Sequence, residues 1–397
     1  MMSARRLHGF LGLVLSAAMI FLAVTGSLSV FADEIEWLAT PAMRVDREAA
    51  GKLPLGRSLE AGLAAVPGAR PVVLTRHPGG RFADRLHVVG PDRTAAFVWV
   101  DPYSGEVTGT GPAVSLRQVL REMHRSLSTG RDGVILGVTA LSLPLAATAI
   151  AGVLLYRRFW TGFFRLPRLS GSRRAMLSDL HRLLAVWLLP FLAVTIVTGL
   201  VFLSELAGLG PSMPSMPWMP MADIGGGSVR AGAIDGPGLD AAVAQATAAL
   251  PGLVVTEVGF PMADGDPLAI RGSDGTALVR PTAGVGFVDP VTLTLIGAIP
   301  AAELGERMRL FEAVRVLHYG TALGLPTRLL WLAFGLGLAA LGVLGAMISA
   351  ERLKKEFAVR GRPPRSGTRH YFSGPGAANW IGLGAAVVAL GLAAATL

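Results

Sequence analysis

The chain has 397 residues, of which 52% are hydrophobic and 16% are charged, and its mean hydropathy is +0.53. These values place it among membrane proteins. The net charge of +9 does not indicate nucleic-acid binding, because many basic residues lie beside hydrophobic segments, where they set topology. The absence of cysteine excludes disulfides, thiolate-bound iron–sulfur clusters and haem attached through C-x-x-C-H.

Five apolar stretches are long enough to cross roughly 30 Å of hydrocarbon, which takes about 20 helical residues. Basic clusters precede the first stretch and follow the second and the fourth. Because Lys and Arg accumulate in cytoplasmic loops, this pattern predicts a cytoplasmic N-terminus. The first apolar run is longer than that of a signal peptide and its pattern returns at His181, which predicts an uncleaved first anchor. We expect the membrane-crossing stretches near 9–31, 134–156, 183–204, 328–349 and 378–396.

This topology predicts alternating membrane, external and cytoplasmic segments. The expected order is a first transmembrane helix at 1–31, an external module at 32–133, a second helix at 134–156, a basic cytoplasmic loop at 157–180, a third helix at 181–204, a second external module at 205–327, a fourth helix at 328–350, a basic loop at 351–377 and a fifth helix at 378–397.

The two halves of the chain carry the same motifs at the same spacing. His8 precedes an apolar run that ends in Thr25-Gly26, and His181 precedes a run that ends in Thr198-Gly199, with a constant offset of about 173 residues. Val100-Asp101-Pro102 and Val288-Asp289-Pro290 each begin a turn expected between two strands. The fold class that follows is a mainly α membrane protein. It contains a parallel two-fold repeat of transmembrane helix pairs, a fifth span and two small α+β external modules.

Each external module is expected to combine a short helix with several strands. Helices are predicted from Ser58 to Gly68 and from Leu239 to Gly252. β-Branched residues and flanking turn residues predict strands at 71–76, 85–90, 94–100, 253–258, 267–272 and 276–280.

A second pair of histidines, His124 and His318, lies on helices expected at 115–126 and 303–318, just outside the second and fourth spans. Parallel repeats are related by an axis along the membrane normal, which brings equivalent residues face to face. Haem takes two axial ligands on opposite faces, so His8 with His181 and His124 with His318 are predicted to hold two b-type haems. Arg121, Arg315 and Arg182 are candidate partners for the haem propionates.

Other interpretations of these residues remain open. Histidines at a membrane interface can simply cap helices, whereas zinc or non-haem iron would require more ligands than the sequence places nearby. Met213, Met216 and Met219 fall on one edge of a Pro-rich segment that would suit copper(I), or they form a loop that rests against lipid. His77, His87 and His370 have no repeat partner and are expected to be surface or turn residues.

Taken in order, these motifs resemble the PepSY-associated transmembrane family, which includes inner-membrane ferric-siderophore reductases with b-type haem. The resemblance implies a bacterial inner-membrane protein with two periplasmic PepSY-like modules that reduces a ferric siderophore, or another ferric chelate, during iron uptake. The second turn, Val291 to Thr294, departs from the pattern because it lacks the glycine.

Electrons must reach this chain from outside it. The loop at 157–180 is too short for a flavin or nicotinamide domain, and no G-x-G-x-x-G follows a strand. The expected donor is therefore a membrane quinol or a separate reductase. Alternative functions are a non-enzymatic module that binds or regulates a periplasmic protease, and a transporter for a siderophore or haem.

Overall fold

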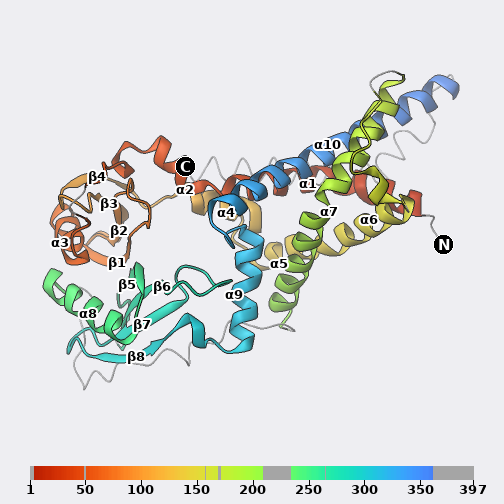
Figure 1. Ribbon diagram of the computed structural model, residues 1–397. Helices are drawn as coiled ribbons and strands as arrows, with labels where there is room; N and C mark the ends of the chain where they lie inside the picture. The colour runs from red at the N-terminus through yellow and green to blue at the C-terminus, as the bar shows by residue number, and fades with distance from the viewer. Residues whose placement is uncertain are drawn as a thin grey trace. The chain divides into compact units, whose positions relative to one another are not determined.

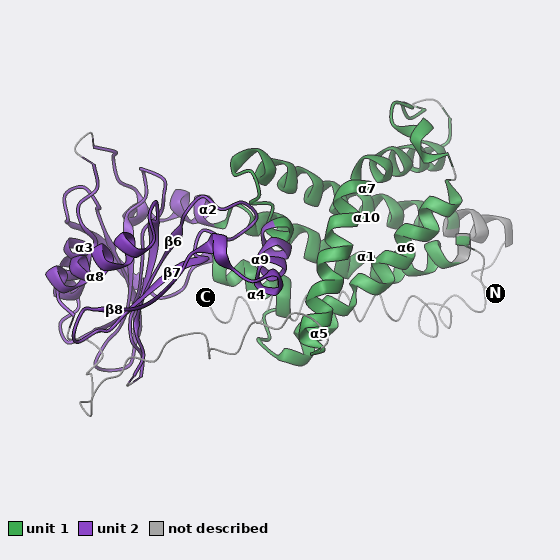
Figure 2. Ribbon diagram, turned by 60° about the horizontal axis from the view of Figure 1, so that its bottom comes forward, with its two compact units in different colours: residues 1–32, 117–210, 317–397 green, residues 33–116, 211–316 purple. Residues whose placement is uncertain are grey.

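The computed structural model describes residues 4–48, 51–156, 158–168, 171–208, 234–263 and 265–360. The chain divides into two compact units (Figure 2). The helical unit comprises residues 1–32, 117–210 and 317–397, and the sheet unit comprises residues 33–116 and 211–316. The expected fifth span at 378–397, His370, and the methionines Met213, Met216 and Met219 lie outside the described residues.

Long apolar helices make up most of the helical unit (Figure 1). Within the described residues, four stretches are long and apolar enough to cross a membrane, at Leu7–Ser29, Asp132–Leu155, Arg173–Leu206 and Leu325–Arg352. The protein is therefore a membrane protein with α and β parts. The helices are α1 (Ala4–Ser29), α5 (Asp132–Ala140), α6 (Ser142–Leu155), α7 (Arg173–Leu206) and α10 (Leu325–Arg360), with the short η2 (Phe159–Gly162).

The second apolar stretch consists of two helices, α5 and α6, which meet at Leu141. Pro144 lies in the first turn of α6. Backbone N–H groups in the first turn have no partner within the helix, so a proline there removes no helical hydrogen bond. Two shorter helices, α4 (Leu116–Ser126) and α9 (Glu306–Tyr319), carry His124 and His318.

The sheet unit is built on one antiparallel sheet of eight strands, in the order β4-β3-β2-β1-β5-β6-β7-β8. The strands of the two external modules expected from the sequence therefore belong to one continuous sheet. They join where β1 pairs with β5, with Leu74 opposite Val258. The strands are β1 (Arg70–Thr75), β2 (Asp84–Val89), β3 (Ala95–Val100), β4 (Val107–Pro112), β5 (Val254–Gly259), β6 (Leu268–Ser273), β7 (Gly284–Val288) and β8 (Leu295–Ile299).

One predicted strand is wrong. Residues 276–280 form turns, and the strand that follows β6 begins only at Gly284. The Asp274 carboxylate accepts hydrogen bonds from the backbone N–H groups of Thr276 and Ala301. A carboxylate that binds nearby backbone N–H groups favours a turn over a strand, although the β-branched content of this segment suggested otherwise.

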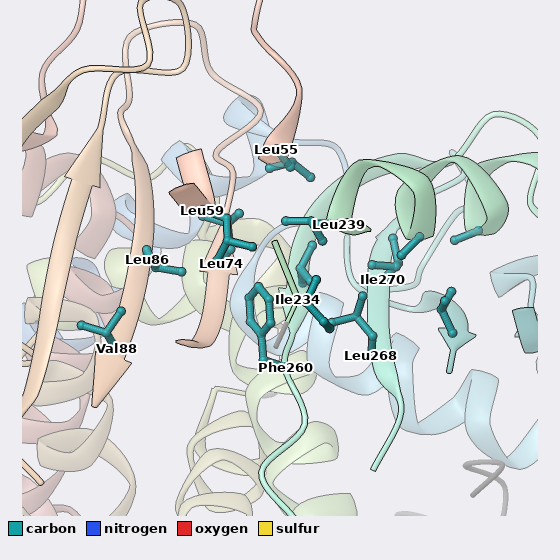
Figure 3. Packing of buried hydrophobic residues seen from close by; sticks show 14 of the residues in the cluster. Leu55, Leu59, Leu74, Leu86, Val88, Ile234, Leu239, Phe260, Leu268 and Ile270 are labelled. Carbon is teal, nitrogen blue, oxygen red and sulfur yellow. The ribbon is translucent and has the colours of Figure 1, made fainter. Parts of the chain in front are cut away.

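Two helices cover one face of the sheet, α3 (Leu55–Ala65) and α8 (Gly236–Ala249). Their apolar sides pack on the inward-facing residues of the strands (Figure 3). Leu59, Leu74, Leu239 and Ile270 are fully buried there, and burial of one such side chain contributes roughly 2 kcal/mol. Three short helical segments complete the unit, α2 (Ala32–Ala39), η1 (Pro41–Met43) and η4 (Ala301–Glu303).

A charged residue, Asp84, is completely buried at the start of β2. Arg76 binds its carboxylate at 2.5 Å, and the Ser58 hydroxyl donates a hydrogen bond to it at 2.7 Å. A buried charge is tolerated when it is paired and hydrogen-bonded in this way. This group connects α3, the end of β1 and the start of β2.

Replacement of Arg76 by Ala should destabilise the sheet unit by about 3–5 kcal/mol, because Asp84 would keep a buried charge without its partner. The measurement is thermal unfolding of the purified protein in detergent. The control is Arg57→Ala, which breaks the exposed pair with Glu60 and should cost at most about 0.5 kcal/mol. Equal losses in both variants would contradict the proposed role of the buried pair.

A second ion pair, between Arg280 and Glu312, makes the stability of the sheet unit depend on pH. Burial raises the pKa of Glu312, but hydrogen bonds from Arg280 and its charge outweigh burial, so the pKa lies below its usual value of 4.5. A lowered pKa in the folded state stabilises the protein at neutral pH, and this stabilisation is lost as pH falls below about 4.5.

The unfolding temperature should fall as the pH decreases from neutral to below about 4.5, and replacement of Glu312 by Gln should make this fall smaller. The control is Glu257→Gln, which removes a half-exposed carboxylate paired with Arg271. The prediction fails if the two variants give the same pH profile.

Candidate functional site

Two histidines face each other between α1 and α7. The ring centroids of His8 and His181 are 6.2 Å apart, and the rings are nearly perpendicular, at 78°. Nδ1 of His8 lies 2.9 Å from the Thr148 carbonyl of α6. A carbonyl can only accept, so Nδ1 is the donor in this contact, and the acceptor nitrogen of the neutral imidazole is then Nε2.

A second pair of histidines meets between α4 and α9. The rings of His124 and His318 also have centroids 6.2 Å apart, with an angle of 50° between them. Nδ1 of His124 lies 2.9 Å from the Leu22 carbonyl of α1, which again can only accept. The sequence-predicted pairs are thus the pairs that the structure brings together.

Thr198 of α7 orients His318 in the same way. Its hydroxyl donates to the Val194 carbonyl, so its oxygen accepts from Nδ1 of His318 at 2.9 Å. Thr25 occupies the matching position in α1, where its hydroxyl donates to the Phe21 carbonyl and lies 3.5 Å from Nδ1 of His124. In both cases the threonine oxygen contacts Nδ1 of the histidine.

The separation within each pair matches two ligands on one metal. A bond between a metal and an imidazole nitrogen is about 2 Å long, which puts the centroids of two opposed rings roughly 6 Å apart. Metal-bound histidines nearly always bind a carbonyl, carboxylate or water through their second nitrogen, as His8 and His124 do here. Nδ1 of His181 is buried and makes no hydrogen bond within the described residues.

A glycine allows His124 to lie against α1. A Cβ built on Gly26 would lie 2.8 Å from Cε1 and 2.9 Å from Nδ1 of the imidazole, closer than real Cβ contacts. Gly152 of α6 lies beside His8 in a similar way, although an added Cβ there would be 3.3 Å from the ring.

The two pairs lie at different levels of the helical unit. Along α7, 17 residues separate His181, a member of the first pair, from Thr198, which contacts the second pair. At about 1.5 Å per residue the levels are roughly 25 Å apart, close to the thickness of a hydrocarbon core.

Protonation would compete with metal binding at His124. Its ring is enclosed by α1, and burial lowers the pKa of His124 despite the hydrogen bond to Leu22, which acts in the opposite direction. The neutral imidazole, which is the form that binds metals, is therefore favoured.

Two of the three candidate arginines already contact other side chains. Arg182 is exposed and pairs with Asp179. The Arg315 guanidinium lies 3.2 Å from the centroid of the Phe311 ring and donates to the Phe311 carbonyl. Arg121 is exposed on α4. Their role toward propionates stays a prediction.

No group of three or more His, Cys, Asp or Glu that could hold a metal ion occurs among the residues that the structure describes. Among the residues that are described, both sites therefore offer two imidazoles and no further ligand of these types. This donor set fits a group that supplies its own equatorial ligands, such as haem, better than zinc, which takes four ligands.

Apolar and aromatic surfaces surround the histidines. The Phe202 ring lies 5.0 Å from that of His318, and the Trp331 indole donates to the His318 carbonyl. Beside His181, a cavity of about 430 Å³ opens between α7 and α10. It is lined by Leu180, Leu183, Leu184, Trp187, Leu188, Ala333, Phe334, Gly337 and Leu344.

Sequence reasoning missed the residues that orient the imidazoles. The repeated Thr-Gly at 25–26 and 198–199 was visible as a motif, and its equal spacing from the two histidines was the available signal. The carbonyls of Thr148 and Leu22 leave no signal, since every residue has one. His87, expected at the surface or in a turn, lies half-buried within β2 instead.

Gly26→Ala should destabilise the protein by about 1–3 kcal/mol, because the new methyl group overlaps the His124 ring. Gly12→Ala is the matched control in the same helix, since an added Cβ there has nothing within 4 Å. Thermal unfolding measures both. In a His124→Ala background the cost of Gly26→Ala should disappear, and a cost that persists there would contradict the contact.

Comparison with known proteins gives two findings. Residues 5–352 match the family model described as "PepSY-associated TM region". An uncharacterised protein of Pseudomonas aeruginosa is 31% identical over 266 residues, which cover 61% of this chain and 64% of the relative. The match thus spans somewhat less than two thirds of the relative's length.

Proposed function

The chain belongs to the PepSY-associated TM family, and from this premise we propose that it transfers electrons across a membrane through two b-type haems. Its proposed role is to reduce a ferric siderophore, or another ferric chelate, during iron uptake. The observation that carries the proposal is the pair of opposed histidines, found twice with the same centroid separation of 6.2 Å.

The residues present fit haem as the bound group. His8 and His181 would hold one haem, and His124 and His318 the other. Bound between such imidazoles, haem supplies a one-electron carrier. The chain itself orients each ring: Thr148 and Leu22 through their carbonyls and Thr198 through its hydroxyl.

A parallel two-fold repeat explains why the contacts occur twice. Thr25 and Thr198 follow His8 and His181 at equal spacing, and each approaches Nδ1 of a histidine in the second pair. An axis along the membrane normal relates equivalent residues of two parallel repeats and places them opposite each other. Each haem would then take one ligand from each half.

The direction of transfer follows from the basic loops. Lys and Arg cluster between the second and third apolar stretches and after the fourth, which supports a cytoplasmic position for those loops. The membrane in this proposal is the inner membrane of a bacterium. His8 and His181 then lie on the cytoplasmic side, and the sheet unit lies in the periplasm. The electron donor would be a quinol or a separate reductase.

Reduction of the chelate is a one-electron step: the ferric ion gains one electron, and the donor loses one. The ferrous ion is a softer acid and binds hard oxygen ligands less well, so the chelate releases its iron. The protein residues need only hold the carriers and admit the chelate.

The experiment that tests this proposal is a dithionite-reduced minus oxidised absorption spectrum of the purified protein, with pyridine haemochrome quantitation. Low-spin b-type bands with about two haems per chain are expected from the two pairs. Protein without haem after expression with ample haem supply would overturn the proposal and favour a module that binds or regulates a protease.

The haem content of single His→Ala variants shows which histidine pair holds which haem. His124→Ala and His318→Ala should each remove one haem and leave the low-spin bands of the other, because the levels are roughly 25 Å apart. His8→Ala and His181→Ala should remove the second haem. His77→Ala, which alters a ring stacked on Phe82 in the sheet unit, is the control and should retain both. Full haem content in all four ligand variants would count against ligation by these histidines.

A further inference from the structure

The cavity between α7 and α10 lies beside the His8 and His181 pair but is not enclosed by it. Its volume is about 430 Å³, and the residues that line it, as far as the chain is described, belong to α7 and α10 alone. His8 and His181 are not among them, and the partner of His8, Thr148, lies on α6. The cavity therefore offers space for a second ligand next to the histidine pair.

The lining of this cavity favours an apolar ligand. The lining residues that are described are leucines, two aromatic residues, one alanine and one glycine. Trp187 is 49% exposed and Ala333 is also exposed, so the cavity opens on the outer surface of the helical unit. In a membrane protein that surface contacts lipid, and a lipid-soluble ligand can enter without crossing water.

One end of the cavity lies at the level of the His181 ring. Leu180 and Leu184 line the cavity and flank His181 on α7. On α10, the lining residue Leu344 directly precedes Gly345. A Cβ built on Gly345 would lie 3.5 Å from Cε1 and 3.9 Å from Nδ1 of His181, so this edge of the ring faces α10.

Nδ1 of His181 is buried and makes no hydrogen bond within the part of the chain that is described. The other three paired histidines have a carbonyl or a hydroxyl oxygen at this atom. With Nε2 of His181 on the metal, Nδ1 carries the hydrogen and needs an acceptor. Because buried polar groups are ordinarily satisfied by protein, water or a ligand, an oxygen atom of a bound ligand fits this position.

A small polar pocket adjoins the cavity at Leu183, which lines both. Tyr156, Asp179 and Arg182 are among the residues around it. Its volume of about 20 Å³ accommodates about one water molecule. A water held there can accept protons from a ligand in the cavity.

We infer that this cavity binds the quinol that supplies electrons to the His8 and His181 pair. The ring and isoprenoid tail of a quinol match the apolar lining, and one of its hydroxyl oxygens would accept from Nδ1 of His181. Oxidation of the quinol to the quinone releases two electrons and two protons. The electrons pass one at a time to two ferric ions, and the protons pass to water in the pocket beside Asp179.

This inference rests on the proposed function, because it names the electron donor of that reaction, but its first test does not need electron transfer. The probe is decylubiquinone, which carries the quinone ring on an alkyl tail. The full-length protein is held on an affinity resin in detergent, and the quinone retained above that on empty resin is extracted and measured by its absorbance. The competitor is 1-decanol, which has the tail without the ring.

The wild-type protein should retain about one quinone per chain, and 1-decanol at the same concentration should not displace it. Ala333→Phe and Leu183→Trp fill the cavity from its two helices, and each should weaken binding at least roughly tenfold. The matched control is Val343→Phe, at an exposed position of α10 that does not line the cavity. It should bind as the wild type does.

The reduced probe, decylubiquinol, then tests electron supply. It should reduce the haem of the wild type and of Val343→Phe at equal rates, and that of Ala333→Phe roughly tenfold more slowly or less, at concentrations below saturation. Dithionite, which needs no binding site, should reduce all three alike. Thermal unfolding identifies any variant that fails to fold.

Wild-type retention of the quinone in both cavity variants, or its displacement by 1-decanol, overturns the inference. Reduction of both cavity variants by decylubiquinol at the wild-type rate overturns it as well. A protein that contains haem but retains no quinone refutes this site alone, whereas quinone binding by a protein without haem refutes the proposed function alone.

Discussion

A histidine that is to bind a ligand inside a helix bundle must have its second ring nitrogen satisfied, because no water is available there. In this protein three of the four paired histidines meet that constraint, and His181 does not within the described residues. Nδ1 of His8 and of His124 each bind a backbone carbonyl of a neighbouring helix, and Nδ1 of His318 binds a threonine hydroxyl. Such short contacts require the helices to approach closely, and a glycine at position 26 makes the approach to α1 possible. The imidazoles are therefore oriented by the same contacts that pack the bundle.

Much of this arrangement was accessible from the sequence, because membrane helices and repeated motifs leave strong patterns. Four of the expected apolar stretches correspond to helices, and the repeat identified which histidines would face each other. The hydrogen-bond partners of the imidazole rings could not be predicted from the sequence. A carbonyl such as that of Leu22 is contributed by the backbone, so its role depends on helix packing and not on the residue type.

The sheet unit was predicted less well, for two physical reasons. The segment at 276–280 has β-branched residues, but the Asp274 carboxylate accepts a hydrogen bond from the Thr276 backbone N–H, which favours a turn there. The lack of a repeat partner alone predicts a surface or turn position for His87. Its alternation with Leu86 and Val88, which are fully buried on the helix-covered side, places it on the other face of the sheet. Period-two patterning, applied residue by residue, would have shown this.

The pairing of β1 with β5 has a consequence for assembly. The two strands run antiparallel, with Leu74 opposite Val258, which is the arrangement a two-fold axis produces between two copies of one edge strand. A chain with only one set of four strands would leave that edge unpaired and open to another molecule. This chain contains both sides of the junction, so the contact forms here within one polypeptide, independent of protein concentration.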